Sequence, residues 1–279
     1  MALTPLPEPL RPTVPESSSA SRSQPGWPEV ELFDAVVTVQ IDPVVSWYSA
    51  TKSVIDWFTA LALLVPALPL IGVCWLAVRL TSPGPGFYLQ SRLGRGGREY
   101  RIIKLRTMAH KAEEKTGGAK WSTKGDMRIT RLGAFLRKTH FDELPQLFNV
   151  LMGQMSLVGP RPERKSIIDK LELEKHVPGY AHRLLVKPGV TGLAQVQLPA
   201  DEDINSVKHK VVYDLYYIEN YSLWLDLRLM LCTVFKAAGL HPRWAQRVFW
   251  LPHRDTVAEV FQSNLTPSPL EQSSNLQPV

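Results

Sequence analysis

Residues 57–78 carry no charged side chain over 22 consecutive positions. A helix of that length is long enough to cross the hydrocarbon core of a bilayer, so a membrane-spanning anchor is the simplest interpretation. Two features favour another path. Pro66 and Pro69 lie near the middle of the stretch, where each removes a backbone hydrogen bond and favours a kink. Basic residues also flank both ends, namely Lys52 before it and Arg79, Arg92, Arg95, Arg98 and Arg101 after it.

The flanking charges bear on how this segment meets a membrane. Positive charge near a membrane segment prefers the cytoplasmic side, so both ends favour the same side. A helix that enters the membrane, breaks at Pro66 and Pro69 and returns satisfies both the prolines and the charges. The residues alone leave a re-entrant and a spanning helix both open.

An adjacent acidic pair, Asp142 and Glu143, opens a second notable segment, which reads THFDELPQLFNVLMGQMSLVGPRP over residues 139–162. Apolar residues recur after the pair at the three- and four-residue spacing of a helix with one buried stripe, at Leu144, Leu147, Phe148 and Leu151. Asp142 is a good helix-capping residue type, and acids suit the positive end of a helix dipole. Pro145 fits early in a helix because its missing N–H costs little there.

An acidic pair at a helix start is most often only a cap, but basic residues surround this one. Arg128, Arg131, Arg137 and Lys138 precede the pair, and the stiff Val-Gly-Pro-Arg-Pro turn presents Arg161 after it. Helix N-termini bind phosphate through their free N–H groups, and carboxylates bind divalent cations. The combination therefore suits a site for a phosphorylated ligand with a metal ion.

A long motif makes the comparison with a known family specific. Its first part contains Asp126, Arg128, Thr130, Gly133, Leu136 and Arg137; its second contains residues 142–147, 149–151, Gly153, Met155, Ser156 and 158–162. This pattern resembles the signature of the bacterial sugar transferases, the monotopic polyprenyl-phosphate phosphoglycosyl transferases. The resemblance extends from about residue 52 to about residue 239.

The resemblance implies an α-rich α+β fold with a re-entrant membrane helix hairpin, interfacial amphipathic helices and a small cytosolic catalytic domain. It places the protein on the cytoplasmic face of the bacterial inner membrane. In the family a Ser-Pro pair makes the membrane break. Here Pro69 falls at the matching position, Leu68 replaces the serine, and Pro66 is a second helix breaker nearby.

These expectations divide the chain into four parts. We expect a poorly ordered tail at residues 1–45, the membrane segment at 46–82, the catalytic domain at 83–240, and a basic, aromatic interfacial segment with a disordered tail at 241–279. No signal peptide is expected, because the first apolar run begins too late.

The activity that the resemblance implies is transfer of a sugar 1-phosphate from a UDP-sugar to undecaprenyl phosphate, with release of UMP. Asp142 would be the nucleophile that forms a covalent phosphosugar intermediate, and Glu143 would hold Mg2+ with help from Asp142. Arg137 would meet the lipid phosphate, and Arg161 would steady either the nucleotide or the fold at the active-site floor. Matches to shorter family motifs add Arg92, Lys104 and Arg106 as substrate-binding residues.

Composition agrees with an anionic partner and leaves other classes of function open. The net charge is +6 and the pI about 9.3, which suits a membrane surface, a nucleotide or nucleic acid. We expect no nucleic-acid partner, and a homodimer is possible. The alternative to an enzyme is a non-catalytic, membrane-anchored binding or scaffold protein. Cys74 and Cys232 lie in apolar runs and predict no disulfide framework.

Other segments give local predictions. Residues 36–41 suit a short strand or the start of an interfacial helix, and residues 100–107 alternate like a strand. Residues 90–97 suit a glycine-rich phosphate cradle or, more simply, a hairpin turn. Residues 207–221 predict a core helix, and residues 222–239 predict a helix lying on a membrane. Disorder is expected from Asn264 onward.

Overall fold

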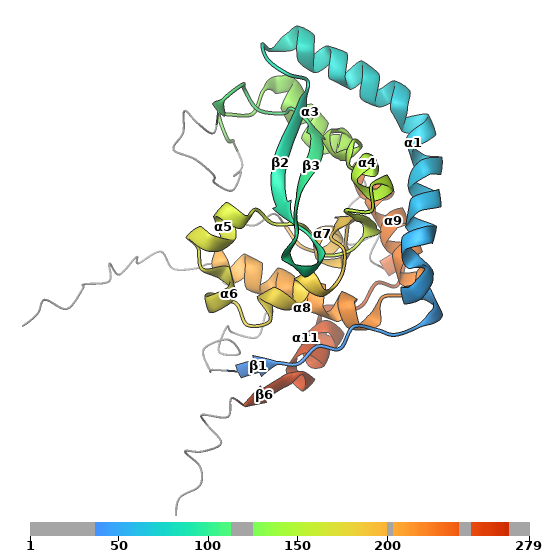
Figure 1. The fold of residues 1–279 in the computed structure, drawn as a ribbon, viewed down its shortest axis with the longest axis vertical. Helices are drawn as coiled ribbons and strands as arrows, with labels where there is room; N and C mark the ends of the chain where they lie inside the picture. Colours follow the sequence, from blue (N-terminus) through green and yellow to red (C-terminus); the bar gives the residue numbers. More distant parts are fainter. Residues whose placement is uncertain (1–36, 113–124, 200–202, 240–246, 268–279) are drawn as a thin grey trace, which may run out of the picture. The chain divides into compact units, whose positions relative to one another are not determined.

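The computed structural model describes residues 37–112, 125–199, 203–239 and 247–267. The longer helices are α1 (Trp47–Thr81), α3 (Arg131–Thr139), α8 (Ile204–Asn220), α9 (Leu223–Ala237) and α11 (Arg254–Ser263). The shorter helices are η2 (Arg95–Gly97), η3 (Phe141–Glu143), α4 (Gln146–Leu151), α5 (Lys165–Lys170), α6 (Leu173–His176), η4 (Tyr180–Leu185) and α7 (Leu193–Gln197). The strands are β1 (Val37–Val39), β2 (Phe87–Leu93), β3 (Glu99–Leu105), β4 (Ser156–Val158), β5 (Gly189–Thr191) and β6 (Leu265–Pro267). This composition confirms the predicted helix-rich fold with a small β component (Figure 1).

Within the described residues the strands form three two-stranded sheets. Strands β2 and β3 make an antiparallel hairpin in which Phe87 pairs with Leu105 and Leu93 with Glu99. The hairpin turns through η2, where Gly96 and Gly97 adopt positive φ angles of 67° and 72° that favour glycine. The strand expected at 100–107 and the hairpin interpretation of residues 90–97 are therefore both confirmed.

Two strands lie inside segments that were expected to be tails. Strand β1 pairs antiparallel with β6, so that Val37 lies opposite Pro267 and Val39 opposite Leu265. Strand β1 is one of the two structures expected at residues 36–41, whereas β6 corrects the expectation of disorder at residues 265–267. The pairing joins opposite ends of the chain, and local composition carries no signal for such a distant partner.

The apolar segment forms one continuous helix. Helix α1 begins at a capping box formed by Ser46 and Ser49, and Pro66 and Pro69 lie inside it without interrupting it. The helix follows a curved path in Figure 1, as expected where prolines remove backbone hydrogen bonds. The predicted break at these prolines is thus a bend rather than a loss of helix.

Both ends of α1 contact other elements of the structure. Near its start, Lys52 forms an ion pair with Asp226 of α9. Near its end, Cys74 and Val78 join a buried cluster with Leu105 and Leu136. The start of the helix is therefore held by α9 and its end by β3 and α3.

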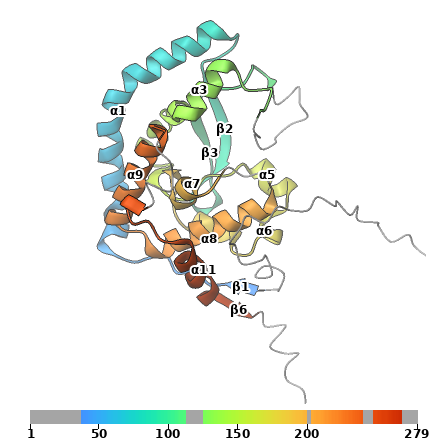
Figure 2. The same ribbon diagram turned by 180° about the vertical axis from the view of Figure 1, so that it is seen from behind.

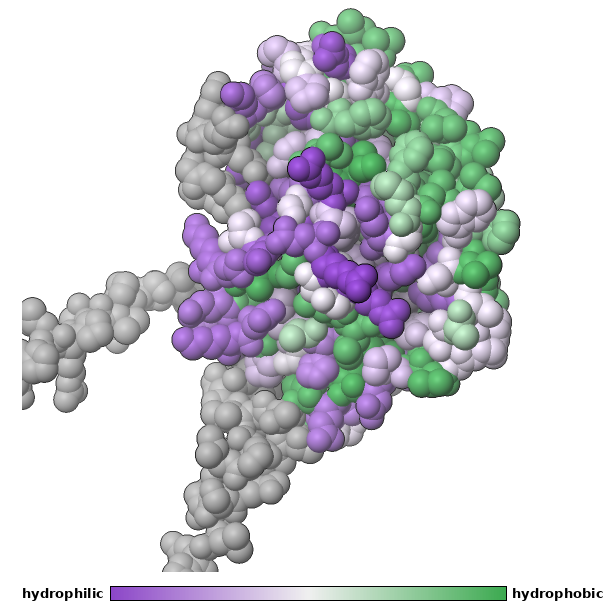
Figure 3. All heavy atoms as spheres, in the orientation of Figure 1, coloured by the Kyte–Doolittle hydropathy of each residue, from purple (hydrophilic) through white to green (hydrophobic). Residues whose placement is uncertain are grey.

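Large apolar side chains remain exposed on the outer face of α1, and Figure 3 shows a hydrophobic surface along the path of this helix. Val65 and Val73 are 65% and 66% exposed. Helix α1 is the one helix in the described residues that is long and apolar enough to cross a membrane. On α9, Trp224 and Val234 are exposed by similar fractions. Such a surface is typical of contact with lipid.

Helix α8 lies at the centre of the second half of the chain. It begins at a capping box made by Asp203 and Ser206 and buries Val211, Leu215 and Ile218. Helix α7 packs against both α8 and α9 (Figures 1 and 2). The core-helix prediction for residues 207–221 is confirmed, and the predicted helix at 222–239 is α9.

Candidate active site

A sharp change of backbone direction presents the acidic pair. Helix α3 ends at His140, which adopts the left-handed conformation with φ 58°. The 3-10 turn η3 then carries Asp142 and Glu143, and α4 begins separately at Gln146. The expectation of one helix capped by Asp142 was wrong, because no side chain caps η3 and His140 forms the turn. Consecutive residues of a 3-10 helix point about 120° apart, so the two carboxylates face different surroundings.

A close approach of backbone segments fixes α3 beside the hairpin. A Cβ atom on Gly133 would lie 2.0 Å from the carbonyl oxygen of Thr107, so only glycine permits this packing. The Thr107 hydroxyl also accepts a hydrogen bond of 2.9 Å from Nε of Arg137. This bond orients Arg137, and the charge of Asp142 acts on its guanidinium.

Two cations hold Glu143. Nζ of Lys104, from β3, lies 2.7 Å from Oε1 of Glu143, and the Arg161 guanidinium lies 3.5 Å from the same oxygen. Burial alone would raise the pKa of Glu143, but Lys104 and Arg161 together hold that pKa well below its ordinary value. Glu143 is therefore an anion at any physiological pH.

Asp142 has different surroundings. Its side chain is 7% exposed and makes no hydrogen bond or ion pair with any residue in the described part of the chain. Burial and the neighbouring Glu143 charge raise the pKa of Asp142 to about 6, against opposing effects of Lys104, Arg137 and Arg161. The pair thus combines a fixed anion with a more basic carboxylate that has no internal partner among the described residues.

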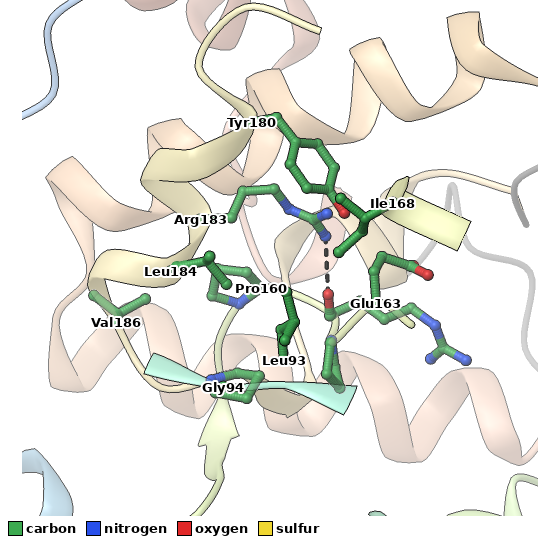
Figure 4. A pocket seen from close by; sticks show the side chains of 12 residues that line it. Leu93, Gly94, Pro160, Glu163, Ile168, Tyr180, Arg183, Leu184 and Val186 are labelled. Atoms are coloured by element: carbon green, nitrogen blue, oxygen red, sulfur yellow. Dashed lines mark hydrogen bonds between the residues drawn. The ribbon is translucent and has the colours of Figure 1, made fainter. Parts of the chain in front are cut away.

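The turn that carries Arg161 is held from both sides. Strand β4 runs parallel to β5, and their crossing is so tight that a Cβ on Gly189 would lie 2.1 Å from the Gly159 nitrogen. On the other side, the Arg183 guanidinium donates a 2.9 Å hydrogen bond to the Arg161 carbonyl (Figure 4). Arg183 is in turn bonded to Asp214 of α8 at 2.8 Å. These contacts fix the base of the Arg161 side chain.

A pocket borders the turn that carries Arg161. Its lining is largely apolar and includes Pro160, Ile168 and Val186, with Tyr180 and Arg183 beside them (Figure 4). It shares Arg161 and Pro162 with a second, more basic recess.

We call the second recess the basic recess. It is lined by Arg92, Ile102, Lys104, Gln146, Arg161, Pro162 and Gly189. Three predicted substrate-binding residues, Arg92, Lys104 and Arg161, therefore meet in one place. Their roles stay predictions. Arg106 lies elsewhere: it is buried, and its guanidinium bonds the carbonyls of Ser82 and Pro83, where the chain leaves α1.

Sequence reasoning missed two buried amides of α4. We expected Leu144, Leu147, Phe148 and Leu151 to form the buried stripe, but of these only Leu147 is fully buried. The residues buried in α4 are Gln146, Leu147, Asn149 and Val150. The amide residue types at positions 146 and 149 were visible in the sequence, but an apolar periodicity cannot assign them to the buried face.

The carboxylates suit a metal ion that arrives with a ligand. No group of three or more His, Cys, Asp or Glu side chains in the described residues is arranged to hold a metal. Mg2+ usually keeps several waters and binds one or two carboxylates together with substrate phosphates. Asp142 and Glu143 fit that donor set, because Asp142 has no partner in the described chain and Glu143 is ionised.

Comparison with known proteins relates this geometry to a family. A family model described as "Bacterial sugar transferase" matches residues 47–239. The chain is 44% identical over 174 residues to the UDP-N-acetylgalactosamine-undecaprenyl-phosphate N-acetylgalactosaminephosphotransferase of Aeromonas hydrophila, which covers 61% of this chain and 40% of that protein.

Two further relatives act with glucose according to their names. The UDP-glucose:undecaprenyl-phosphate glucose-1-phosphate transferase of Xanthomonas campestris is 40% identical over 196 residues, or 70% of this chain and 40% of that protein. That of Caulobacter vibrioides is 43% identical over 185 residues, or 66% of this chain and 68% of that protein. The matched region thus spans about two fifths of the first two relatives and two thirds of the third.

Proposed function

The chain belongs to the bacterial sugar transferase family, and from that premise we propose that it transfers a sugar 1-phosphate from a UDP-sugar to undecaprenyl phosphate. The reaction releases UMP and forms undecaprenyl-diphosphate-sugar, the first membrane step in assembly of a polysaccharide or glycoconjugate. The observation that carries the proposal is the acidic pair with two distinct electrostatic states: Glu143 is an anion, and Asp142 is more basic and has no partner among the described residues.

Asp142 is the nucleophile in this proposal. One carboxylate oxygen attacks the phosphorus that carries the sugar, the bond between that phosphorus and the UMP oxygen breaks, and UMP leaves with the electron pair. This gives an aspartyl-phosphosugar. An oxygen of undecaprenyl phosphate then attacks the same phosphorus and displaces the Asp142 carboxylate. A pKa of about 6 leaves Asp142 mostly ionised at neutral pH and more basic than an ordinary aspartate.

The cations around the pair match the charge of the substrates. Glu143 and Asp142 would hold Mg2+, which when bound neutralises the diphosphate and stabilises the leaving group. Lys104 and Arg161 keep Glu143 ionised for that purpose and add positive charge for the nucleotide phosphates. Arg137, on α3, is close enough to feel the charge of Asp142. Its guanidinium suits the acceptor phosphate, because it can bind phosphate oxygens in a bidentate manner.

We propose further that α1 enters one leaflet and returns on the cytoplasmic face of the inner membrane. Its 35 residues extend about 52 Å, well beyond the roughly 30 Å of a bilayer core. A straight crossing would separate its two ends, yet both ends contact the catalytic elements. The exposed apolar face between them supports a shallow, curved insertion. This depth would bring Asp142 to the level of the lipid phosphates.

The proposal is tested by UMP release from the purified protein in lipid nanodiscs. The reaction contains undecaprenyl phosphate, Mg2+ and either UDP-glucose, UDP-N-acetylgalactosamine or another UDP-sugar. We expect release with at least one donor, abolished by Asp142→Asn and retained by Asp255→Asn, whose side chain is 76% exposed on α11. If the folded protein releases no UMP with any of the donors, the binding or scaffold alternative is favoured.

A further inference from the structure

The basic recess is lined by residues with buried hydrogen-bond donors that no described residue uses. Nε2 of Gln146 and Nε of Arg92 are among the buried side-chain atoms that have no hydrogen-bond partner in the described residues. Gln146 is 2% exposed, and both residues line the recess. Buried donors are nearly always paired because an unpaired one is costly, so these two need an explanation.

A comparison within α4 shows that an unused amide is not a general property of this helix. Asn149, one turn after Gln146, is fully buried and uses its side chain completely. Its Oδ1 accepts from the Ile103 N–H at 3.0 Å, and its Nδ2 donates to the Arg101 carbonyl and to Gln154, both at 2.8 Å. Asn149 thus ties α4 to β3, whereas the amide nitrogen of Gln146 makes no such tie.

The charges around Gln146 define the partner that the recess would accept. Arg92, Lys104 and Arg161 bring three cations, against the carboxylates of Glu143 and Glu163 that pair with them. The other two guanidinium nitrogens of Arg92 are occupied, by the Pro162 carbonyl at 2.9 Å and by Gln90 at 2.6 Å. A recess rich in donors and positive charge fits a ligand that carries several acceptor oxygens and negative charge.

We propose that Gln146 is a substrate-binding residue whose amide donates a hydrogen bond to a phosphate oxygen of the ligand, with Nε of Arg92 donating beside it. This inference rests on the proposed function for the identity of the phosphate. Two sources share the chemistry, the diphosphate of the nucleotide sugar and the phosphate of the polyprenyl acceptor. Glu143 lies three residues before Gln146 and binds Lys104 of the same recess, so either phosphate would lie close to the reacting centre.

The test measures equilibrium binding and therefore does not depend on turnover. The full chain in nanodiscs is titrated with UDP in one arm and with a short-chain polyprenyl phosphate in the other, by calorimetry. The variants are Gln146→Leu, which removes the donor, and Gln146→Glu, which keeps the size and replaces the donor by a carboxylate. Gln262→Leu, at an exposed position of α11, is the matched control.

We expect Gln146→Leu to raise the Kd of one ligand about tenfold or more, as for loss of a hydrogen bond to a charged group. Gln146→Glu should raise that Kd further, because its charge repels phosphate, without lowering the melting temperature. The affected arm identifies the source of the phosphate. A change of less than fivefold in both arms for Gln146→Glu, or native protein that binds neither ligand, would overturn the inference.

UMP release measured on the same samples separates this inference from the proposed function. If the native protein releases UMP and Gln146→Glu binds both ligands normally, the proposed role of Gln146 is overturned and the proposed function is not. If the native protein releases no UMP and Gln146→Glu loses UDP binding, the proposed reaction is contradicted and the role of Gln146 in ligand binding is supported.

Discussion

The structure contains two buried polar clusters, and they differ in how completely they are hydrogen-bonded. The first, which we call the anchor cluster, consists of Tyr48, Lys52, Asp56, Ser156, Tyr217 and Asp226. All four carboxylate oxygens in it have partners: Asp56 accepts from Lys52 and Ser156, and Asp226 accepts from Tyr48, Lys52 and Tyr217. The second is the acidic pair with the basic recess, where the Asp142 carboxylate and the Gln146 amide nitrogen have no partner in the described chain.

The difference teaches how similar residue types serve different purposes. Buried polar groups that satisfy one another hold elements together, and here they join α1 to α9 and to β4. Buried polar groups left unsatisfied cost stability and are retained where a ligand can complete them. We therefore expect changes in the anchor cluster to lower stability and changes at the acidic pair to lower activity.

The largest expected effect follows from Asp142→Asn. Loss of the nucleophile should reduce UMP release by at least about a thousandfold, or about 4 kcal/mol of transition-state stabilisation. The same change should leave stability at pH 7 equal or higher. The pKa of Asp142 is raised from 3.8 to about 6, so the folded state favours the protonated side chain. The stability of the folded protein therefore decreases as the pH rises through 6. Melting curves without Mg2+ should show a gain of about 3 kcal/mol at most at pH 7 and none below pH 3.8.

Asp226→Asn should have the opposite profile. It leaves Lys52 and two tyrosine hydroxyls facing a neutral amide in a buried site, and breaking a buried ion pair typically costs about 3 kcal/mol or more. Unfolding in nanodiscs measures this loss, and UMP release per folded molecule should fall less than threefold. A loss of activity as large as that of Asp142→Asn, at unchanged stability, would break the distinction between the clusters.

Lys104→Met should have an intermediate effect that includes a shift with pH. Lys104 lowers the pKa of both Asp142 and Glu143, so its removal raises both. We expect kcat/KM at pH 7 to fall about tenfold or more, and the pH below which the rate declines to move upward from about 6. An unshifted pH profile would show that Lys104 does not act on the acidic pair.

Glu172→Gln should have the smallest effect. Glu172 pairs with Lys175 at 3.5 Å, but the two side chains are 57% and 72% exposed. Exposed pairs contribute about 0.5 kcal/mol or less, so neither unfolding nor UMP release should change measurably. A clear loss here would show that ion pairing in general, rather than buried pairing, stabilises this protein.

The sequence predicted the parts of the site that a linear motif contains. Glu143, Lys104, Arg161 and Arg92 were all candidates from the sequence, and the structure brings them together, while their roles stay predictions. The apolar helix, the strand at residues 100–107 and the core helix α8 also followed from periodicity. Each of these signals is local, and a resemblance to a family extends it to the neighbouring motifs.

The features that the sequence did not predict depend on distant contacts or on backbone geometry. His140 adopts a left-handed conformation that residue type does not require, and this separates α3 from η3. Gln146 and Asn149 are buried against β3 and the recess rather than placed by helix periodicity. Arg106 matched a substrate motif, yet its position is set by the carbonyls at the end of α1.

The most direct test of the central claim is a single-turnover experiment without acceptor. Native protein in nanodiscs free of polyprenyl phosphate is mixed with Mg2+ and the accepted UDP-sugar, and both UMP and the intact protein mass are followed. We predict a burst approaching one UMP per protein, with a phosphosugar adduct on the peptide that contains Asp142. Release of UMP only after acceptor is added, with no adduct at any time, would contradict the assignment of Asp142 as the nucleophile.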